Sequence, residues 1–169
     1  MRPRHAVLLV AALAAMCLFA SALSGVRARP LHHQSLSQLQ VYAYRDWQST
    51  TYSLHPGDRY EISAKGKWLY SPMVGLHGPA GSKHHISPPF YPLPGVPGGA
   101  LIGRVGEDGQ PFYVGAKSWG VADRTGRLYL RIDDDRLGDN SGKLSVDITI
   151  VTPQTGQPDA ATPTTSPSR

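Results

Sequence analysis

Cysteine and asparagine are almost absent from this sequence. The one cysteine, Cys17, lies in an apolar stretch near the start, and the single asparagine, Asn140, lies in a late acidic segment. Without that apolar stretch, the chain can form no disulfide and offers no thiolate to a soft metal. Its stability must then come from an apolar core and, where one is bound, from an ion. This suits a protein exported by a bacterium better than a disulfide-rich secreted one.

Long apolar runs are confined to residues 1–22, "MRPRHAVLLVAALAAMCLFASA". Early arginines, an apolar run and then small residues are the parts of a secretory signal. We therefore expect cleavage after Ala22 and a secreted or periplasmic protein. The run is nearly long enough to cross a bilayer, so an uncleaved membrane anchor is the alternative. Met16 is too large for a lipoprotein signal, which argues against a lipid on Cys17.

Helical periodicity and clustered basic side chains are also missing. Lysine and arginine number 17 against 12 for aspartate and glutamate, but they are scattered along the chain. We therefore expect no nucleic-acid partner, because proteins that bind nucleic acid concentrate positive charge on one element. No GxSxG-type motif or similar nucleophile signature occurs, so the sequence does not predict an enzyme.

Short alternating segments predict strands. In residues 143–151, "KLSVDITIV", apolar side chains alternate with polar ones. About eight such strands, joined by turns rich in proline and glycine, predict an all-β protein with a β-sandwich or jelly-roll fold. The clearest hairpin is expected in residues 50–68, where Pro56 and Gly57 have the chemistry of a type II turn. Residues 116–126 are expected to form a loop.

Composition divides the chain into four parts. The expected organisation is a leader or anchor (residues 1–22), a linker (23–38), a β-sandwich domain (39–152) and a disordered tail (153–169). The linker shows no sustained period. The tail is rich in proline and threonine and has almost no apolar residues, a composition that cannot form a core.

A long segment inside the domain, residues 69–99, holds seven of the chain's 15 prolines. A loop of this length in a compact domain is usually functional. His77, His84 and His85 lie in it, but no carboxylate or thiol accompanies them at metal-binding spacing, so zinc is not favoured. Trp68, which precedes the segment, is expected to pack in the core rather than stack on a sugar.

The segment "DDDRLGDNSG", residues 133–142, concentrates negative charge in a basic chain. It contains Asn140 and four aspartates: Asp133, Asp134, Asp135 and Asp139. Carboxylates about 4 Å apart repel by about 4 kcal/mol per pair at an effective dielectric of about 20, so an ordered loop needs positive charge. These oxygen ligands favour calcium, although Leu144 stands where an EF-hand requires glutamate. The alternative is a solvated hairpin turn whose aspartates pair with Arg131 and Arg136.

Several motifs occur in a recognisable order. They are "HPGDRYEISAKGKW" (residues 55–68), "GP" (78–79), "GGALIGRVG" (98–106), "PFYVG" (111–115), and "GRLYLRIDD" (126–134) followed by "GDNSG" (138–142). Over residues 40–150 the chain resembles the small calcium-dependent galactose-binding bacterial lectins and the lectin-like domains related to them. The resemblance implies a non-catalytic carbohydrate-binding module, with calcium as cofactor and a galactose-like sugar as partner.

The resemblance also implies a set of site residues. The calcium ligands would be the side chains of Asp134, Asp139 and Asn140 and the backbone carbonyls of Ser71 and Arg136. The sugar would contact His85, Asp134 and Asn140. Arg136 stands where the galactose-binding lectin has a threonine, and the acidic segment is about two residues shorter than in that lectin. The alternative is an exported structural or interaction domain of the same fold that binds no sugar.

Overall fold

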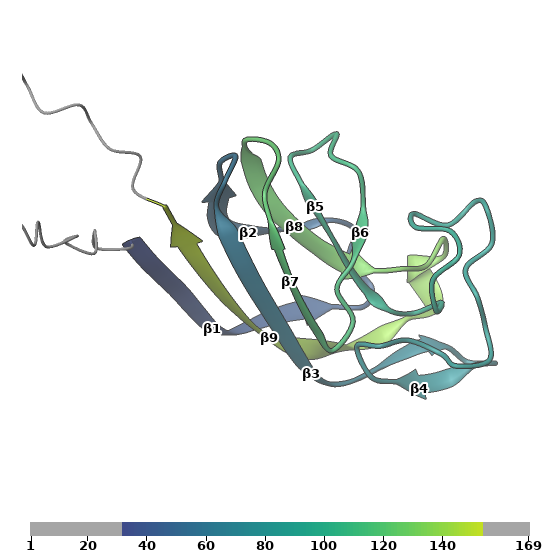
Figure 1. Cartoon of the computed structure of the whole chain (residues 1–169). Helices are drawn as coiled ribbons and strands as arrows, with labels where there is room; N and C mark the ends of the chain where they lie inside the picture. Colours follow the sequence, from purple (N-terminus) through teal and green to yellow (C-terminus); the bar gives the residue numbers. More distant parts are fainter. Residues whose placement is uncertain (1–31, 154–169) are drawn as a thin grey trace, which may run out of the picture. The chain divides into compact units, whose positions relative to one another are not determined.

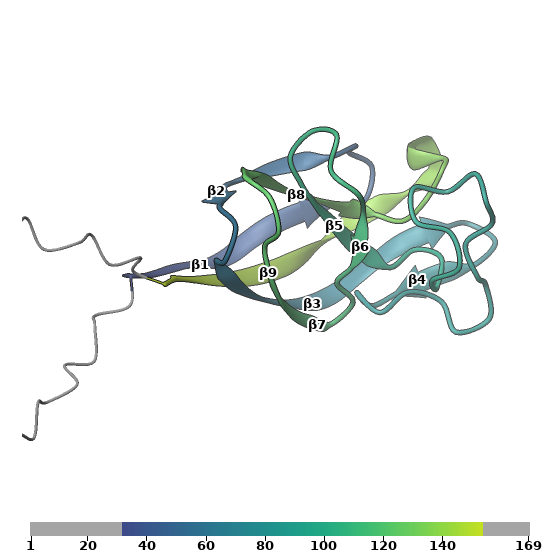
Figure 2. The ribbon, with the colours of Figure 1, turned by 45° about the horizontal axis from the view of Figure 1, so that its top comes forward.

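Two antiparallel sheets make up the computed structural model, which describes residues 32–153. The strands are β1 (His32–Tyr42), β2 (Gln48–Leu54), β3 (Arg59–Ser71), β4 (Gly75–His77), β5 (Leu101–Val105), β6 (Phe112–Tyr113), β7 (Lys117–Val121), β8 (Gly126–Ile132) and β9 (Ser141–Thr152), and a 3-10 turn, η1 (Leu137–Asp139), precedes β9. Figures 1 and 2 show the two sheets as facing layers. The predicted all-β sandwich is confirmed.

The core lies between a five-stranded and a four-stranded sheet. The first has the order β1-β9-β3-β4, with β7 also paired to β3, and the second has the order β2-β8-β5-β6. The apolar positions of β9 predicted from its alternation are all buried: Leu144, Val146, Ile148 and Ile150. Leu128 and Leu130 of β8 are fully buried in the same core. Burying each such side chain contributes about 1.5–3 kcal/mol.

The expected hairpin in residues 50–68 is wrong, although its turn exists. Strand β2 pairs with β8, whereas β3 pairs with β9, β7 and β4, so the chain passes from one sheet to the other. The Asp58 N–H donates to the His55 carbonyl at 3.0 Å, and Gly57 has φ +92°, as a type II turn requires. Both arms alternate because both sheets face one core, and alternation does not specify which strands pair.

Strand β1 begins at His32, so the expected linker of residues 23–38 is wrong for residues 32–38. These residues pair with the end of β9, from His32 opposite Thr152 to Leu36 opposite Ile148. Most of their side chains are exposed, because this part of β1 lies at the edge of the sheet. With nothing to bury, the segment shows no alternation that sequence analysis could detect.

The expected loop at residues 116–126 is also wrong, because residues 117–121 form strand β7. Residues 117–121 pair with Arg59–Ser63 of β3 and alternate only between exposed and half-buried. Trp119 is 80% exposed. A strand without a buried side chain has no apolar pattern, which is why it resembled a loop.

The remaining points concern the pair β5–β6 and the two ends of the chain. Strands β5 and β6 form an antiparallel pair, with Ile102 opposite Tyr113. The leader, its cleavage, and the tail beyond residue 153 lie outside the described residues. In the part of the chain that the structure describes, no helix has the length and apolar character needed to cross a membrane.

Candidate functional site

The acidic loop, residues 133–140, crosses from one sheet to the other at one end of the sandwich. It connects β8 of the four-stranded sheet to β9 of the five-stranded sheet, so it is not the turn of a hairpin. Asp133, Asp134 and Asn140 are 0%, 3% and 6% exposed. The alternative of a solvated hairpin turn is therefore wrong, and the loop carries buried negative charge.

Asp133 fastens the acidic loop to the proline loop, residues 78–100. Its carboxylate accepts hydrogen bonds from the Ser87 hydroxyl (2.5 Å) and the Leu93 N–H (3.0 Å). Its backbone carbonyl accepts from the Gly99 N–H at 2.9 Å. Figures 1 and 2 show the two loops side by side at this end of the molecule. Asp133 thus positions the site without facing it.

Trp68 supports the proline loop from below. Its side chain is fully buried, as expected for a core residue, and its indole N–H donates to the Gly99 carbonyl at 2.9 Å. Gly99 has φ +72°, and a Cβ there would lie 2.6 Å from the Tyr70 ring. The loop can approach the core this closely because glycine has no side chain.

A pocket of about 380 Å³ opens beside the two loops. Five of the six residues predicted for the site line it: Ser71, His85, Asp134, Arg136 and Asp139. The sixth, Asn140, is buried next to Asp139 in the chain and donates to the Ala43 carbonyl at 3.4 Å. Of the three histidines in residues 69–99, only His85 lines the pocket. The structure therefore brings together residues that are up to 68 positions apart in the sequence (71 to 139).

The acidic oxygens of the pocket are not neutralised by basic side chains. Among residues 32–153, no ion pair involves any of the four aspartates of the acidic loop. The Arg131 guanidinium pairs with Asp46 instead and donates to the Asp134 backbone carbonyl at 2.6 Å. Arg136 is exposed, and its backbone N–H donates to the Asp134 carboxylate at 3.3 Å. The expected pairing of the aspartates with the two arginines is therefore wrong.

Three polar atoms at the site are buried without a hydrogen-bond partner: Asp139 Oδ1, Asn140 Oδ1 and His85 Nε2. Native structures leave few such atoms, and each needs an explanation. Two of them, a carboxylate oxygen and an amide oxygen, are of the types that calcium selects, and the Asn140 side chain lies within hydrogen-bonding reach of the buried Asp134 carboxylate. In the described part of the chain no three His, Cys, Asp or Glu side chains are grouped for a metal, so amide and carbonyl oxygens would have to complete a set of ligands.

Aromatic side chains form the other wall of the pocket. The Tyr70 and Tyr91 hydroxyls are 2.8 Å apart, and the His85 ring lies 5.6 Å from the Tyr70 ring and 6.2 Å from the Tyr91 ring. Phe90, 70% exposed, stands at the rim. Burial raises the pKa of the Tyr91 hydroxyl well above its ordinary value, so it stays protonated. The wall offers apolar ring surface and neutral hydroxyl groups next to the acidic oxygens.

Comparison with known proteins bears on the fold. Neither a protein-family model nor a curated protein matches the sequence. A solved structure described as "EclA N-terminal domain; PllA-like lectin" matches with a TM-score of 0.55 at 21% identity, covering 69% of this chain and 97% of the other. The chain has the fold of a PllA-like lectin domain. A likeness at 21% identity establishes the fold alone, and it assigns no function to the residues of the pocket.

Sequence reasoning did not find all of this site. It assigned no role to Asp133, and it left Tyr70, Phe90 and Tyr91 unmentioned as site residues. The only available signal was the aromatic pair Phe90–Tyr91 set among the prolines of "PPFYPLP" (residues 88–94). Aromatic side chains in a loop that cannot form a core often indicate a binding surface.

Burial changes the acidity of the loop carboxyls. It raises the pKa of Asp134, against the effect of hydrogen bonds from the Asn140 side chain and the Arg136 backbone. It also raises the pKa of Asp133, which the Ser87 hydroxyl opposes by hydrogen bonding. In the absence of a cation, both carboxylates therefore destabilise the folded state when they are charged.

This predicts an unusual pH dependence for the protein in a chelator. A carboxyl with a higher pKa in the folded state holds its proton more tightly there, so its contribution to stability falls as pH rises from about 3.9 through the raised value. The difference in unfolding free energy between the native chain and Asp134→Asn, from urea melts at pH 4 to 7, should shift in favour of the variant as pH rises. A difference that does not change with pH would contradict the raised pKa.

Proposed function

We propose that this chain is an exported, non-catalytic module that binds carbohydrate with the help of calcium. The supporting observation is that Asp134, Asp139 and His85 line one pocket, and that the buried Oδ1 atoms of Asp139 and of its neighbour Asn140 accept no hydrogen bond in the described residues. Export rests on the leader expected in residues 1–22, and the lectin fold is consistent with the proposed ligand. The partner is a carbohydrate, and no nucleic acid is expected to bind the pocket.

The residues present suit a calcium ion. The side chains of Asp134, Asp139 and Asn140 would hold it, with the backbone carbonyls of Ser71 and Arg136 as further oxygen ligands. When bound, the ion would neutralise the loop and offer open coordination positions to two adjacent sugar hydroxyls. The attraction of each carboxylate to the divalent ion would then exceed the repulsion between the carboxylates, so the charged loop would be stabilised.

The aromatic wall suits the rest of a sugar. A pyranose has an apolar face of C–H groups, which can pack on the accessible rings of this wall, those of Phe90 and the half-buried Tyr91. His85 lines the pocket and its Nε2 has no hydrogen-bond partner in the described residues, so we expect it to bond to a sugar hydroxyl. The pocket volume of about 380 Å³ lies in the range of small-molecule sites.

The choice of sugar rests on Arg136. Its side chain is exposed at the pocket rim, where the lectins that this chain resembles have a threonine. A guanidinium there changes which hydroxyl pattern fits beside the ion. The family resemblance makes a galactose-like sugar the first candidate, and we expect Arg136→Thr to strengthen binding of galactose if the arginine occupies part of the sugar position.

A glycan array followed by calorimetry tests the proposal. We expect a monosaccharide to bind with a dissociation constant in the millimolar to high micromolar range, about −4 to −5.5 kcal/mol, and only with calcium present. Asp134→Ala should abolish this binding, because it removes a charged ligand of the ion. The matched control is Asp108→Ala, an exposed aspartate outside the pocket, which should retain the binding.

Two results would oppose the proposal in different ways. An array that finds no ligand in the presence of calcium would favour a structural or interaction domain without sugar binding. Sugar binding that survives both a chelator and Asp134→Ala would support carbohydrate recognition and reject the role of the ion.

A further inference from the structure

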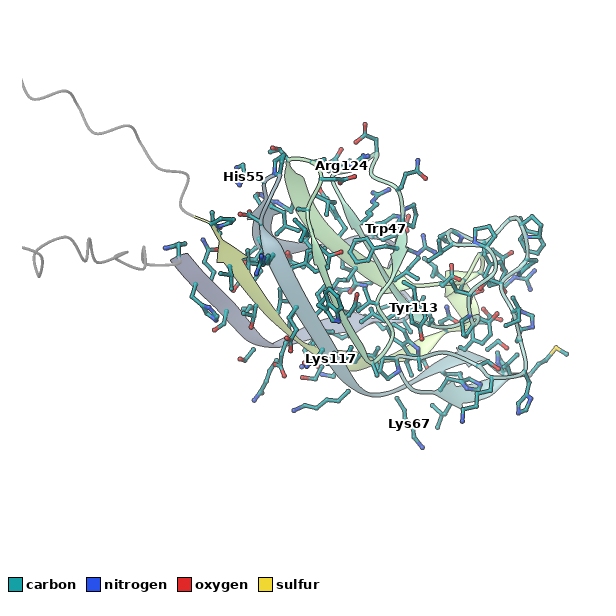
Figure 3. The ribbon with its side chains drawn as sticks, in the orientation of Figure 1. Trp47, His55, Lys67, Tyr113, Lys117 and Arg124 are labelled. Carbon is teal, nitrogen blue, oxygen red and sulfur yellow. The ribbon has the colours of Figure 1, made fainter. Side chains whose placement is uncertain are left out.

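The outer face of the five-stranded sheet gathers positive charge that is scattered in the sequence. Lys143 of β9 lies opposite Tyr42 of β1 on one side and Lys67 of β3 on the other. In the same way, Ser145 lies opposite Lys65. All three lysines are exposed, and the alternate residues of β9 are buried in the core. Figure 3 shows Lys67 extending from the sheet on the side away from the four-stranded sheet.

We call this surface the lysine face: Lys65, Lys67, Lys143 and, in the loop after β1, Arg45. The Arg45 guanidinium lies 4.6 Å from the centre of the Tyr42 ring, and the Lys143 ammonium lies 5.6 Å from it. The Tyr42 ring thus makes cation–π contacts with both Arg45 and Lys143 on this surface.

No acidic side chain neutralises the lysine face. Within residues 32–153 none of its four cations forms an ion pair. The nearest acids on this side of the sheet are engaged elsewhere. Asp147 accepts the Gln38 N–H at 2.8 Å, and Glu61 pairs with Lys117 at 2.8 Å.

The lysine face has an energetic cost that a bound anion would remove. Like charges directly opposite each other on neighbouring strands destabilise a sheet, and Lys67 and Lys143 are such a pair. Strands lie about 4.8 Å apart, and alternate residues of one strand lie about 6.8 Å apart, so the backbone positions of the three lysines repeat at roughly 5–7 Å. A ligand with anionic groups at similar intervals can contact all three at once.

We propose that the lysine face binds an anionic polysaccharide, a sugar chain bearing closely spaced sulfate, phosphate or carboxylate groups. Charge complementarity carries this choice, since the face presents four exposed cations, none of them in an ion pair within residues 32–153. Single-stranded nucleic acid fits less well, because it stacks successive bases on several rings, whereas here the Tyr42 ring is covered by Arg45 and Lys143 and the exposed Tyr44 beside it is a single ring. The site lies on the outer side of the sheet and does not depend on the calcium pocket.

Binding of dextran sulfate to the mature chain, measured by biolayer interferometry, tests this proposal. The variant Lys65→Gln/Lys67→Gln/Lys143→Gln should bind at least tenfold more weakly. The slope of log Kd against log salt should fall by about two units or more, because fewer counterions are released. Neutral dextran should not bind to either protein.

A second triple variant distinguishes the effect of the lysine face from the effect of the protein's net charge. Lys83→Gln/Arg124→Gln/Arg127→Gln removes the same charge from exposed positions outside the lysine face and should change Kd less than twofold. An equal loss in both triple variants would overturn the proposal, since net charge alone would then explain binding. Tighter binding of single-stranded DNA than of dextran sulfate with matched charge would overturn it in favour of a nucleic-acid surface. Asp134→Ala and a chelator should leave dextran sulfate binding intact, which keeps this test separate from that of the pocket.

Discussion

Calcium at 10 mM is expected to raise the free energy of unfolding by about 2.7 kcal/mol. This follows from a dissociation constant of about 10⁻⁴ M, typical of extracellular calcium modules, with the ion in hundredfold excess. For a domain of this size the melting temperature should rise by roughly 10 °C. The physical source is the charge of the buried Asp134 and the half-buried Asp139, neither of which forms an ion pair in the described residues.

Asp134→Asn is expected to change this response in two ways at once. It should abolish the stabilisation by calcium, because the site loses a charged ligand of the ion. It should also make the protein in chelator more stable than the native chain at pH 7, because a buried charge is removed without creating a cavity. Asp108→Asn is the control: that residue is exposed and lies outside the pocket, so the response to calcium should remain. Equal melting of the native chain in calcium and in chelator would reject the ion site.

Trp68→Ala is expected to lower the free energy of unfolding by about 3–5 kcal/mol. The fully buried indole fills the core beneath the proline loop and satisfies the Gly99 carbonyl. Its removal leaves a cavity and an unpaired acceptor, so the proline loop should also lose its position over the pocket. Urea denaturation measures the first effect, and hydrogen exchange in residues 87–99 measures the second.

Two tryptophan variants serve as controls. Trp68→Phe keeps most of the apolar volume but loses the hydrogen bond, so about 1–3 kcal/mol should be lost. Trp119→Ala removes the same side chain from a position that is 80% exposed and should stay within about 0.5 kcal/mol of the native chain. Equal losses at both tryptophans would mean that the packing beneath the proline loop does not contribute as described.

The fold could be predicted wherever a strand buries one side. Strand β9 alternates strictly and was found at nearly its true bounds, whereas β7 and the first half of β1 bury almost nothing and were missed. The pairing of the strands could not be predicted in this way. The segments around Pro56 alternate like a hairpin, but alternation reports only that a side chain faces a core, and two sheets share that core.

Composition and the family resemblance predicted part of the candidate site, whereas the sequence carried no information on its geometry. A concentration of aspartates in a basic chain indicated Asp134 and Asp139, and the motif order placed Ser71 and His85 near them. Asp133 belongs to the same acidic run, yet its carboxylate binds the proline loop. Sequence could not separate the two roles, because adjacent residues point to opposite sides of an extended chain.

The pairing of His32 with Thr152 determines how the domain carries mechanical load. Both ends of the described chain leave at one end of β1 and β9, and the pocket lies where β9 begins, with Ser141 opposite Leu69. A pull between the pocket and Thr152 runs along β9, so its perpendicular hydrogen bonds to β1 and β3 would be sheared together and resist it. A pull that separates His32 from Thr152 would instead peel β1 from β9 one bond at a time. The same strand pair should therefore be strong against load along β9 and weak against load that draws its two ends apart.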